Sequence, residues 1–301
     1  MLSLSKQPGR SKQNWMIRDT ENINPMSSGM DALPVGEFLQ LMHASNKEAF
    51  NAVGPALPEL EKVVKCCVQA IRSGGRVFYI GAGTSGRLGV MDASEVKPTF
   101  GSNSFGAVIA GGAAAMTKAV EGAEDDQEAA RAAADSLNGQ DVAIGIAASG
   151  TTPFVIAFLK RAKEKGGAAW LISSNEVEYG FLDGVVQLLT GPELIAGSTR
   201  LKAATAQKLC LNLISTAVMV QLGKVYNGYM VDVVPGNKKL VERAKRIISS
   251  CTGCDEEEAG RYLEMSGMKP KLAIVMLAKK APREEAERLL SENDGRLRGL
   301  I

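Results

Sequence analysis

Hydroxyl side chains stand among closely spaced glycines in the stretch RVFYIGAGTSGRLGVMDASE, residues 76–95. Its first three glycines fit the G-x-G-x-x-G spacing of a dinucleotide-binding turn. Such a turn needs an Asp or Glu about twenty residues later to bind the ribose hydroxyls. The next apolar run, FGAVIA, ends instead in two glycines and three alanines, so that acid is missing. Thr84 and Ser85 indicate another ligand, because hydroxyls and backbone N–H groups at a helix start converge on an anion.

The same combination recurs after a later apolar run, DVAIGIA. There Ser149, Gly150 and Thr152 precede a proline that suits the first turn of a helix. One such loop on its own is equally typical of an ordinary helix N-cap. Two loops of this composition, both following strands of one sheet, favour a phosphate monoester over a dinucleotide.

Short apolar runs alternate with helical patterns through most of the chain. Apolar residues at three- and four-residue steps predict an amphipathic helix over 57–71, which a Gly-Gly pair ends before the first strand. Strands separated by helices form a mainly parallel sheet flanked by helices, an α/β fold that binds ligands at the carboxyl ends of its strands. The expected strands are residues 76–80, 105–110, 141–147, 168–173 and 185–190.

Composition divides the chain into three parts. Residues 1–30 are a polar N-terminal arm rich in Ser, Asn, Lys and Arg, and residues 31–235 contain the alternating pattern. Within the second part, a long helix with a Ser or Thr N-cap is expected from residue 198 to about 226. Residues 236–301 show only helical patterns divided by glycine and proline, which predicts a small all-helical C-terminal domain.

Charge, apolar content and cysteines exclude several classes of function. Lys and Arg number 35 against 33 Asp and Glu, so the chain lacks the excess positive charge that drives nucleic-acid binding. The apolar runs are shorter than the ~20 residues of a membrane span, and no hydrophobic block near the N-terminus resembles a secretory signal. Five cysteines, two of them adjacent, suit reduced thiols in the cytoplasm. The single CTGC stretch has no second pair and the only histidine, His43, is remote, so no metal site is expected.

Longer strings carry a resemblance to known proteins. GAGTSGR, followed by S-G-x-T after a later strand, resembles the sugar isomerase domain, a family of phosphosugar-binding α/β folds. The resemblance extends from about Thr20 to the C-terminus and leaves residues 1–19 outside. The strings similar to N-acetylmuramic acid 6-phosphate etherases are GAGTSGRLGVMDASEVKPTFG, AVEGAEDD, IGIAASGTTPFVI, GSTRLKAATAQKLCLNLISTAVM, MVDVVPGNKKL and KLAIVML.

The etherase resemblance implies cleavage of the D-lactyl ether at C3 of N-acetylmuramic acid 6-phosphate, a step in recycling cell-wall amino sugars. The products would be N-acetylglucosamine 6-phosphate and D-lactate, formed without metal or coenzyme. The family's two functional carboxylates fall on Glu95, expected to protonate the departing lactate, and on Glu124, expected to be the base. The substrate phosphate would be bound by Thr84, Ser85, Ser149, Gly150 and Thr152.

Three observations leave these catalytic roles open. Glu95 precedes Pro98, where a helix is expected to begin to fail. Glu124 lies in an acidic run that also suits an ordinary helix start, and Glu121 is its rival. Family members usually have Cys-Pro after the first glutamate, whereas this chain has Val-Lys. If Lys97 points towards the carboxyl group, it favours the ionised form and weakens the acid.

Two other functions fit the same fold. A non-catalytic regulator would bind a sugar phosphate and a partner protein, and an aldose-ketose isomerase would use a base at C2 without a leaving group at C3. Retention of both glutamates favours the etherase. The family resemblance also implies a homodimer with residues of both chains near each site, for which the apolar helix 201–222 offers an interface. Further candidates for neutralising the phosphate or an enolate oxygen are Arg87, Arg200 and Lys202.

Overall fold

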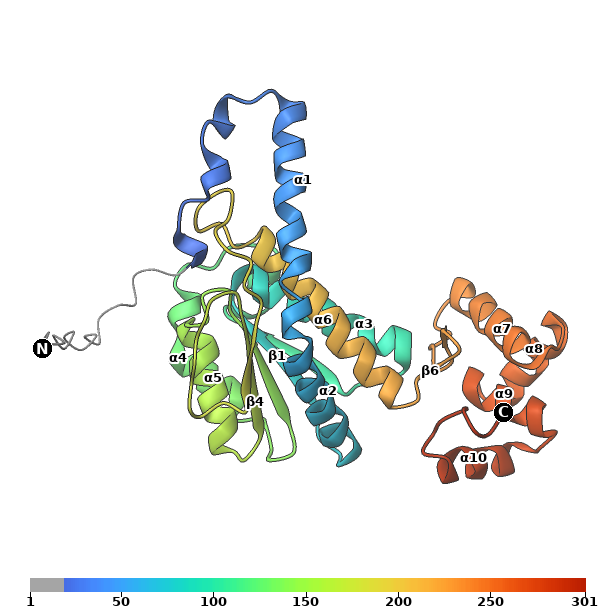
Figure 1. Ribbon diagram of the computed structural model, residues 1–301. Coiled ribbons are helices and arrows are strands. Elements are labelled where there is room, and N and C mark those ends of the chain that lie inside the picture. The colour runs from blue at the N-terminus through green and yellow to red at the C-terminus, as the bar shows by residue number, and fades with distance from the viewer. Residues whose placement is uncertain (1–18) are drawn as a thin grey trace, which may run out of the picture.

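The computed structural model describes residues 19–301, so the expectations for residues 1–18 of the polar arm lie outside the described part. Its centre is a five-stranded parallel sheet with the order β2-β1-β3-β4-β5 (Figure 1). The strands are β1 Val77–Gly81, β2 Phe105–Ile109, β3 Val142–Ile146, β4 Ala168–Ser173 and β5 Gly184–Gln187.

All five strands coincide with the expected apolar runs to within a few residues. Every residue of β3 is buried, because helices cover the sheet on both faces and leave no side of a central strand in water. One face packs against α2 Leu57–Arg72, α3 Gly83–Phe100 and α6 Lys202–Gln221. The other packs against α4 Gln127–Ala134 and α5 Pro153–Glu164. The predicted α/β class is therefore confirmed.

Helix α6 begins later than the sequence pattern suggested, and its N-cap is not a serine or threonine. Leu201 occupies the cap position without a side-chain bond. The fully buried carboxylate of Glu193 instead accepts hydrogen bonds from the backbone N–H groups of Lys202 and Ala203, both at 3.0 Å. A carboxylate from a preceding loop thus satisfies the free N–H groups that a hydroxyl was expected to bind.

Helix α6 is also the one helix among the described residues that is long and apolar enough to cross a membrane. Just over half of its apolar window, 56%, is buried inside the molecule, where the helix packs against α1, α2 and α3. Burial of this kind is typical of a core helix, and it accounts for the apolar composition of α6.

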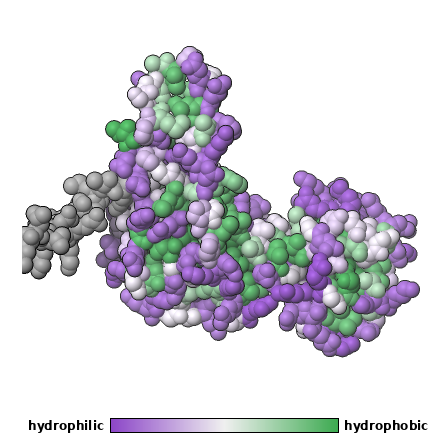
Figure 2. Space-filling view, viewed as in Figure 1, coloured by the Kyte–Doolittle hydropathy of each residue, from purple (hydrophilic) through white to green (hydrophobic). Residues whose placement is uncertain are grey.

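The N-terminal part of the described chain projects from the body of the molecule (Figure 1). It consists of four short 3-10 helices and a long helix, α1, in which Val35 and Leu39 are exposed at 75% and 59%. Figure 2 shows hydrophobic residues among the polar ones near the tip of this projection. The elements are η1 Asp19–Glu21, η2 Pro25–Ser27, η3 Met30–Ala32, α1 Val35–Asn51 and η4 Gly54–Ala56.

After a two-stranded hairpin, the C-terminal part is helical and has a hydrophobic cluster of its own. Val231 and Val233 belong to this cluster, so it begins slightly before the expected boundary at residue 235. Gly253 caps one helix and Pro270 starts another, as the sequence suggested. The elements are β6 Val225–Tyr226, β7 Tyr229–Met230, α7 Lys238–Thr252, α8 Glu256–Met265, α9 Pro270–Lys279 and α10 Arg283–Glu292.

Candidate active site

The two hydroxyl-bearing loops leave the sheet side by side. They follow β1 and β3, which are neighbours in the sheet and pair in parallel with Gly81 opposite Ile146. Adjacent strands lie about 4.8 Å apart, so the loops begin within one strand spacing of each other. The chain leaves β1 for β2 on one side and β3 lies on the other, which makes this a topological switch point, the usual ligand position in such sheets.

The glycines of the first loop allow α3 to start very close to β1. A Cβ on Gly86 would lie 2.7 Å from the carbonyl oxygen of Gly81 and from a side-chain carbon of Ile109. Gly83 has a φ of +52°, a left-handed conformation that favours glycine, and the space beside it is open. The G-x-G-x-x-G spacing therefore serves close packing of strand and helix. It places Thr84 and Ser85 in the first turn of α3, where backbone N–H groups are free.

The second loop is held by the segment that follows β4. Asn175 Nδ2 donates to the carbonyl oxygen of Ala148 at 2.8 Å, and the Tyr179 hydroxyl donates to that of Gly150 at 3.0 Å. Gly150 has a φ of +75°, and a Cβ there would meet the Ser173 hydroxyl at 2.7 Å. These contacts fix the loop backbone through its carbonyl groups. They do not involve the hydroxyl side chains of Ser149 and Thr152.

Those hydroxyls are not used as helix caps. Thr152 occupies the N-cap position of α5, yet its side chain makes no capping hydrogen bond. Ser149 Oγ accepts from the backbone N–H of Thr151 at 3.2 Å, a local turn that leaves its own hydrogen available. Within residues 19–301, neither Thr84 nor Thr152 has a side-chain hydrogen-bond partner. The simple N-cap alternative therefore does not account for Thr152.

Glu124 lies at the same edge of the sheet. After β2 the chain forms η5 Gly112–Met116 and η6 Ala123–Asp125, and a Cβ on Gly111 would lie 3.2 Å from that of Ala123. Ala123 packs into the cluster that contains Phe154 at the start of α5. Glu124 is exposed on this short helix, next in sequence to the anchoring alanine. The acidic run was also expected to be an ordinary helix start. This is the role of Asp126, which caps α4 by accepting from Ala129 N–H at 2.9 Å.

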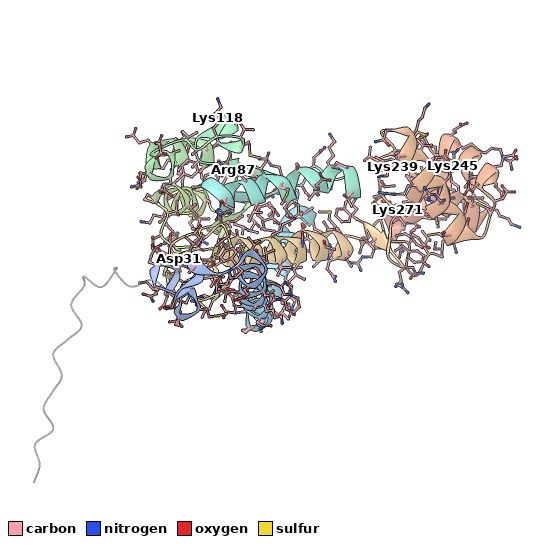
Figure 3. The ribbon with its side chains drawn as sticks, turned by 90° about the horizontal axis from the view of Figure 1, so that it is seen from above. Asp31, Arg87, Lys118, Lys239, Lys245 and Lys271 are labelled. Carbon is pink, nitrogen blue, oxygen red and sulfur yellow. The ribbon has the colours of Figure 1, made fainter. Side chains whose placement is uncertain are left out.

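The basic candidates are largely engaged in structural contacts. Arg87 on α3 donates to the backbone carbonyls of Met116 and Lys118, at 3.3 and 3.0 Å, and so holds the loop that leads to Glu124 (Figure 3). The Lys202 ammonium group is buried and forms an ion pair with Glu48 of α1. Arg87 therefore positions the loop, and Lys202 ties α6 to α1.

Glu95 occupies a different part of α3. It lies ten residues beyond Ser85, or about 15 Å along the axis at a rise of about 1.5 Å per residue. The helix does not fail before Pro98 but continues to Phe100, where Gly101 ends it in a left-handed conformation. Glu95 and Lys97 are both exposed, and residues two apart on a helix do not face each other. Within one chain, the short helix of Glu124 packs near the start of α5, whereas Glu95 lies about three helical turns beyond Ser85.

Two polar contacts between α3 and α6 were not identified from the sequence. Ser85 Oγ donates to Oε1 of Gln207 at 2.9 Å. Two turns further along α3, the buried Asp92 carboxylate accepts from Nζ of Lys208, the residue after Gln207, at 2.9 Å. Burial raises the pKa of the nearby Tyr79 hydroxyl well above its ordinary value, and Asp92 adds to this effect. The only sequence signal was the helical period, since residues seven apart share one face of a helix.

Comparison with known proteins agrees with the fold. The family described as the glucokinase regulatory protein N-terminal SIS domain matches residues 59–163, which contain both loops. Among solved structures, a ligand-bound protein of Escherichia coli CFT073 has a TM-score of 0.50 at 17% identity, over 65% of this chain and 97% of its own. A putative phosphosugar isomerase from Bacteroides fragilis has the same TM-score and identity over 65% and 95%. At this identity, these two structures show the shared fold.

Relatives of higher identity decide the family. The N-acetylmuramic acid 6-phosphate etherase of Geobacillus thermodenitrificans is 48% identical over 93% of this chain and 97% of its own length. The chain belongs to the N-acetylmuramic acid 6-phosphate etherase family. The etherase of Histophilus somni is 46% identical over 93% of the chain and 94% of its own. The etherase match thus takes in nearly the whole chain, including the C-terminal helices.

Proposed function

We propose that this protein cleaves the D-lactyl ether of N-acetylmuramic acid 6-phosphate, giving N-acetylglucosamine 6-phosphate and D-lactate. The observation that carries the proposal is the 48% identity to an etherase along almost the full length of both proteins. The adjacent hydroxyl-bearing loops after β1 and β3 support it, because they suit the phosphate monoester of such a substrate.

The chemistry follows from the open-chain sugar, whose C1 aldehyde acidifies the proton on C2. A base removes that proton, a C2–C3 double bond forms, and the C3–O bond breaks as an acid protonates the lactate oxygen. Water then adds its hydroxyl to C3, and a proton returns to C2. The net change is hydrolysis of the ether. One carboxylate and one carboxylic acid are sufficient, because each group exchanges its role as base or acid between the elimination and the addition of water.

Glu124 is the proposed base and Glu95 the proposed acid. Glu124 is supported by its place on η6, beside the strand edge where both loops begin. The phosphate would be held by Thr84, Ser85, Ser149, Gly150 and Thr152, with free backbone N–H groups of α3 and α5 adding favourable dipoles. Fixing the phosphate in this way orients C2 and C3 for the two carboxyl groups.

We further propose that Glu95 acts in the site of a second copy of the chain. The approximately 15 Å along α3 between Ser85 and Glu95 exceeds the length from the phosphate to C3 of one sugar. The Glu95 side chain leans towards the start of the helix, which shortens this gap without closing it. A homodimer that places Glu95 of one chain near Glu124 of the other supplies both groups.

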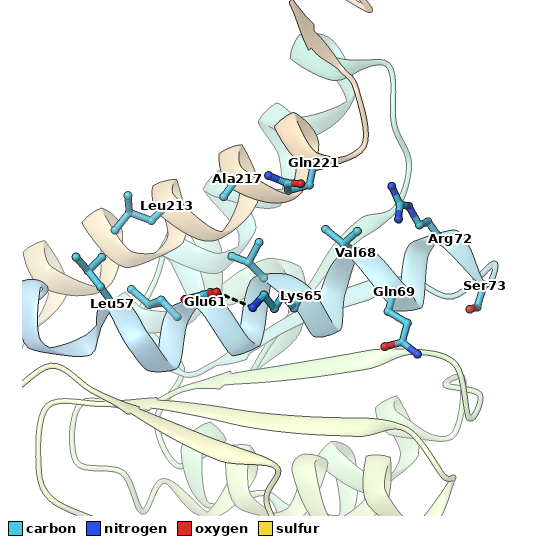
Figure 4. A pocket seen from close by; sticks show the side chains of 12 residues that line it. Leu57, Glu61, Lys65, Val68, Gln69, Arg72, Ser73, Leu213, Ala217 and Gln221 are labelled. Atoms are coloured by element: carbon cyan, nitrogen blue, oxygen red, sulfur yellow. Dashed lines mark ion pairs between the residues drawn. The ribbon is translucent and has the colours of Figure 1, made fainter. Parts of the chain in front are cut away.

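An apolar groove between α2 and α6 supports self-association (Figure 4). Its volume is about 790 Å³, and Leu57 and Leu213 on its walls are 50% and 42% exposed. The ion pair between Glu61 and Lys65 lies along it, so charged groups border an apolar centre, as in many subunit interfaces. We propose that a second copy covers this groove. The five free thiols suit a cytoplasmic location.

Incubation with N-acetylmuramic acid 6-phosphate, followed by an enzymatic assay for D-lactate, tests the function. Release of lactate together with N-acetylglucosamine 6-phosphate supports the etherase. Tight binding without lactate would indicate a phosphosugar sensor, and interconversion of aldose and ketose phosphates without lactate would indicate an isomerase. Either of these results excludes the proposed reaction.

A further inference from the structure

In the proposed phosphate site, the Ser85 hydroxyl that would bind the phosphate already donates a hydrogen bond to Gln207. Ser85 Oγ donates its hydrogen to Oε1 of Gln207, 2.9 Å away on α6. Gln207 is completely buried, and its Nε2 atom has no hydrogen-bond partner among residues 19–301. The pair therefore combines a hydroxyl that points away from the site with an amide donor that has nothing to bind.

The number of hydrogens decides what this pair can do. A hydroxyl has a single hydrogen to donate, whereas a phosphate monoester offers only acceptor oxygens at its charged end. While Ser85 donates to Gln207, it has no hydrogen for the phosphate. A buried N–H without a hydrogen-bond partner is also rare in folded proteins and lowers their stability. A carbonyl oxygen that accepts fewer hydrogen bonds than it could is more common.

We propose that Gln207 is the positioning residue for Ser85 and that bound phosphosugar selects the opposite orientation of its amide. Half a turn about the last side-chain bond places Nε2 where Oε1 now lies, and the 2.9 Å separation suits either bond. Nε2–H then donates to Ser85 Oγ, the buried donor gains its partner, and the Ser85 hydrogen points to the phosphate. This inference rests on the proposed phosphosugar site.

The surroundings of Gln207 restrict it to such a rotation. Its helix is fixed at the start by the Glu193 carboxylate, which accepts from Lys202 and Ala203. The next residue, Lys208, binds Asp92 of α3 at 2.9 Å, which holds the two helices together beside the pair. With the backbone fixed on both sides and the side chain enclosed, the amide plane is the part of Gln207 that can change direction.

The test compares Gln207→Glu and Gln207→Met by the calorimetric dissociation constant for N-acetylglucosamine 6-phosphate, which does not depend on turnover. At a pH high enough to ionise the buried carboxyl group, Glu has the shape of Gln but only accepts, so it keeps the Ser85 hydrogen, and we expect binding about tenfold or more weaker. Met neither donates nor accepts, so Ser85 rotates freely, and a loss of only a few-fold is expected. In turnover the loss should appear mainly in KM.

The Ser85→Ala background separates positioning from packing. If Gln207 acts through Ser85, Gln207→Glu adds no further loss once the hydroxyl is gone. The matched control is Gln40→Glu, the same change at an exposed site on α1, which should bind as the wild type does. Thermal unfolding confirms that each variant is folded.

Three results would overturn the inference: wild-type binding by Gln207→Glu, a larger loss with Met than with Glu, or additive losses in the Ser85→Ala background. The lactate assay on the wild type reports separately on the proposed function. Lactate release with unchanged binding in Gln207→Glu would leave the etherase proposal intact and remove only the role of Gln207.

Discussion

Residues of one chemical type have different tasks within the loop after β2. Asp126 caps α4 with its carboxylate, whereas Glu124 and Glu121 are exposed and free of ion pairs among the described residues. Arg87 holds the same loop through two backbone carbonyls. Asp126 and Arg87 therefore stabilise the loop through backbone groups. Glu124 and Glu121 are exposed, so either carboxylate is free to accept a proton from a substrate.

We expect Glu124→Gln to slow exchange of the C2 proton with solvent by about 100-fold or more, because an amide does not accept that proton. The measurement is deuterium incorporation at C2 of N-acetylglucosamine 6-phosphate in heavy water, followed by NMR. Glu121→Gln, three residues earlier in the same acidic run, is the matched control and should exchange at the wild-type rate. The reverse pattern would transfer the role of base to Glu121.

At the scale of elements, the strand-to-helix turn depends on close approach of backbone to backbone. Gly81 and Gly86 leave no room for a Cβ on either side, which is why α3 starts directly over the end of β1. The same approach directs the first N–H groups of α3 towards the ligand loops. Stability and the proposed phosphate binding would therefore depend on the same turn of helix.

Gly86→Ala should lower the free energy of unfolding by about 1–3 kcal/mol, since the added methyl group meets backbone atoms that cannot move aside easily. Urea denaturation followed by circular dichroism measures this change. Gly36→Ala is the comparison, because Gly36 lies in α1 with open space around it, and alanine there should be neutral or slightly stabilising. Equal stabilities of the two variants would contradict the packing explanation.

At the scale of the whole molecule, the proposed dimer would build each site from two chains, since Glu95 lies about three helix turns from Ser85 of its own chain. The acid and the base would then come from different copies, so each site of a dimer needs one intact glutamate from each partner. This arrangement is distinguishable from a single-chain site by combining two inactive variants.

Glu95→Gln and Glu124→Gln should each abolish lactate release while still binding N-acetylglucosamine 6-phosphate. When they are co-expressed with different affinity tags and purified as a mixed dimer, we expect about half of the wild-type activity per dimer, because one of its two sites has both glutamates. Dimers tagged in the same way but carrying only Glu95→Gln provide the inactive control. An inactive mixed dimer would place both groups in one chain.

The sequence by itself determined the layers and the side of the sheet that carries the loops. Apolar runs alternating with helices are sufficient for a parallel α/β sheet, since right-handed connections then bring every strand to the same edge at its carboxyl end. The sequence placed Thr84, Ser85, Ser149, Gly150 and Thr152 on loops at this edge for the same reason, and their binding of phosphate stays a prediction. Helix ends at Gly253 and Pro270 were also predictable, because their backbone requirements are local.

Only the tertiary structure decided which residues of different elements meet. Nothing local pairs Ser85 with Gln207, which lies 122 positions away, or assigns the capping of α6 to Glu193. Strand order places β1 beside β3, and helix packing sets the face that α3 presents to α6. Such contacts depend on how whole helices fit against one sheet, and the periodicity of a single segment contains no information about its neighbour.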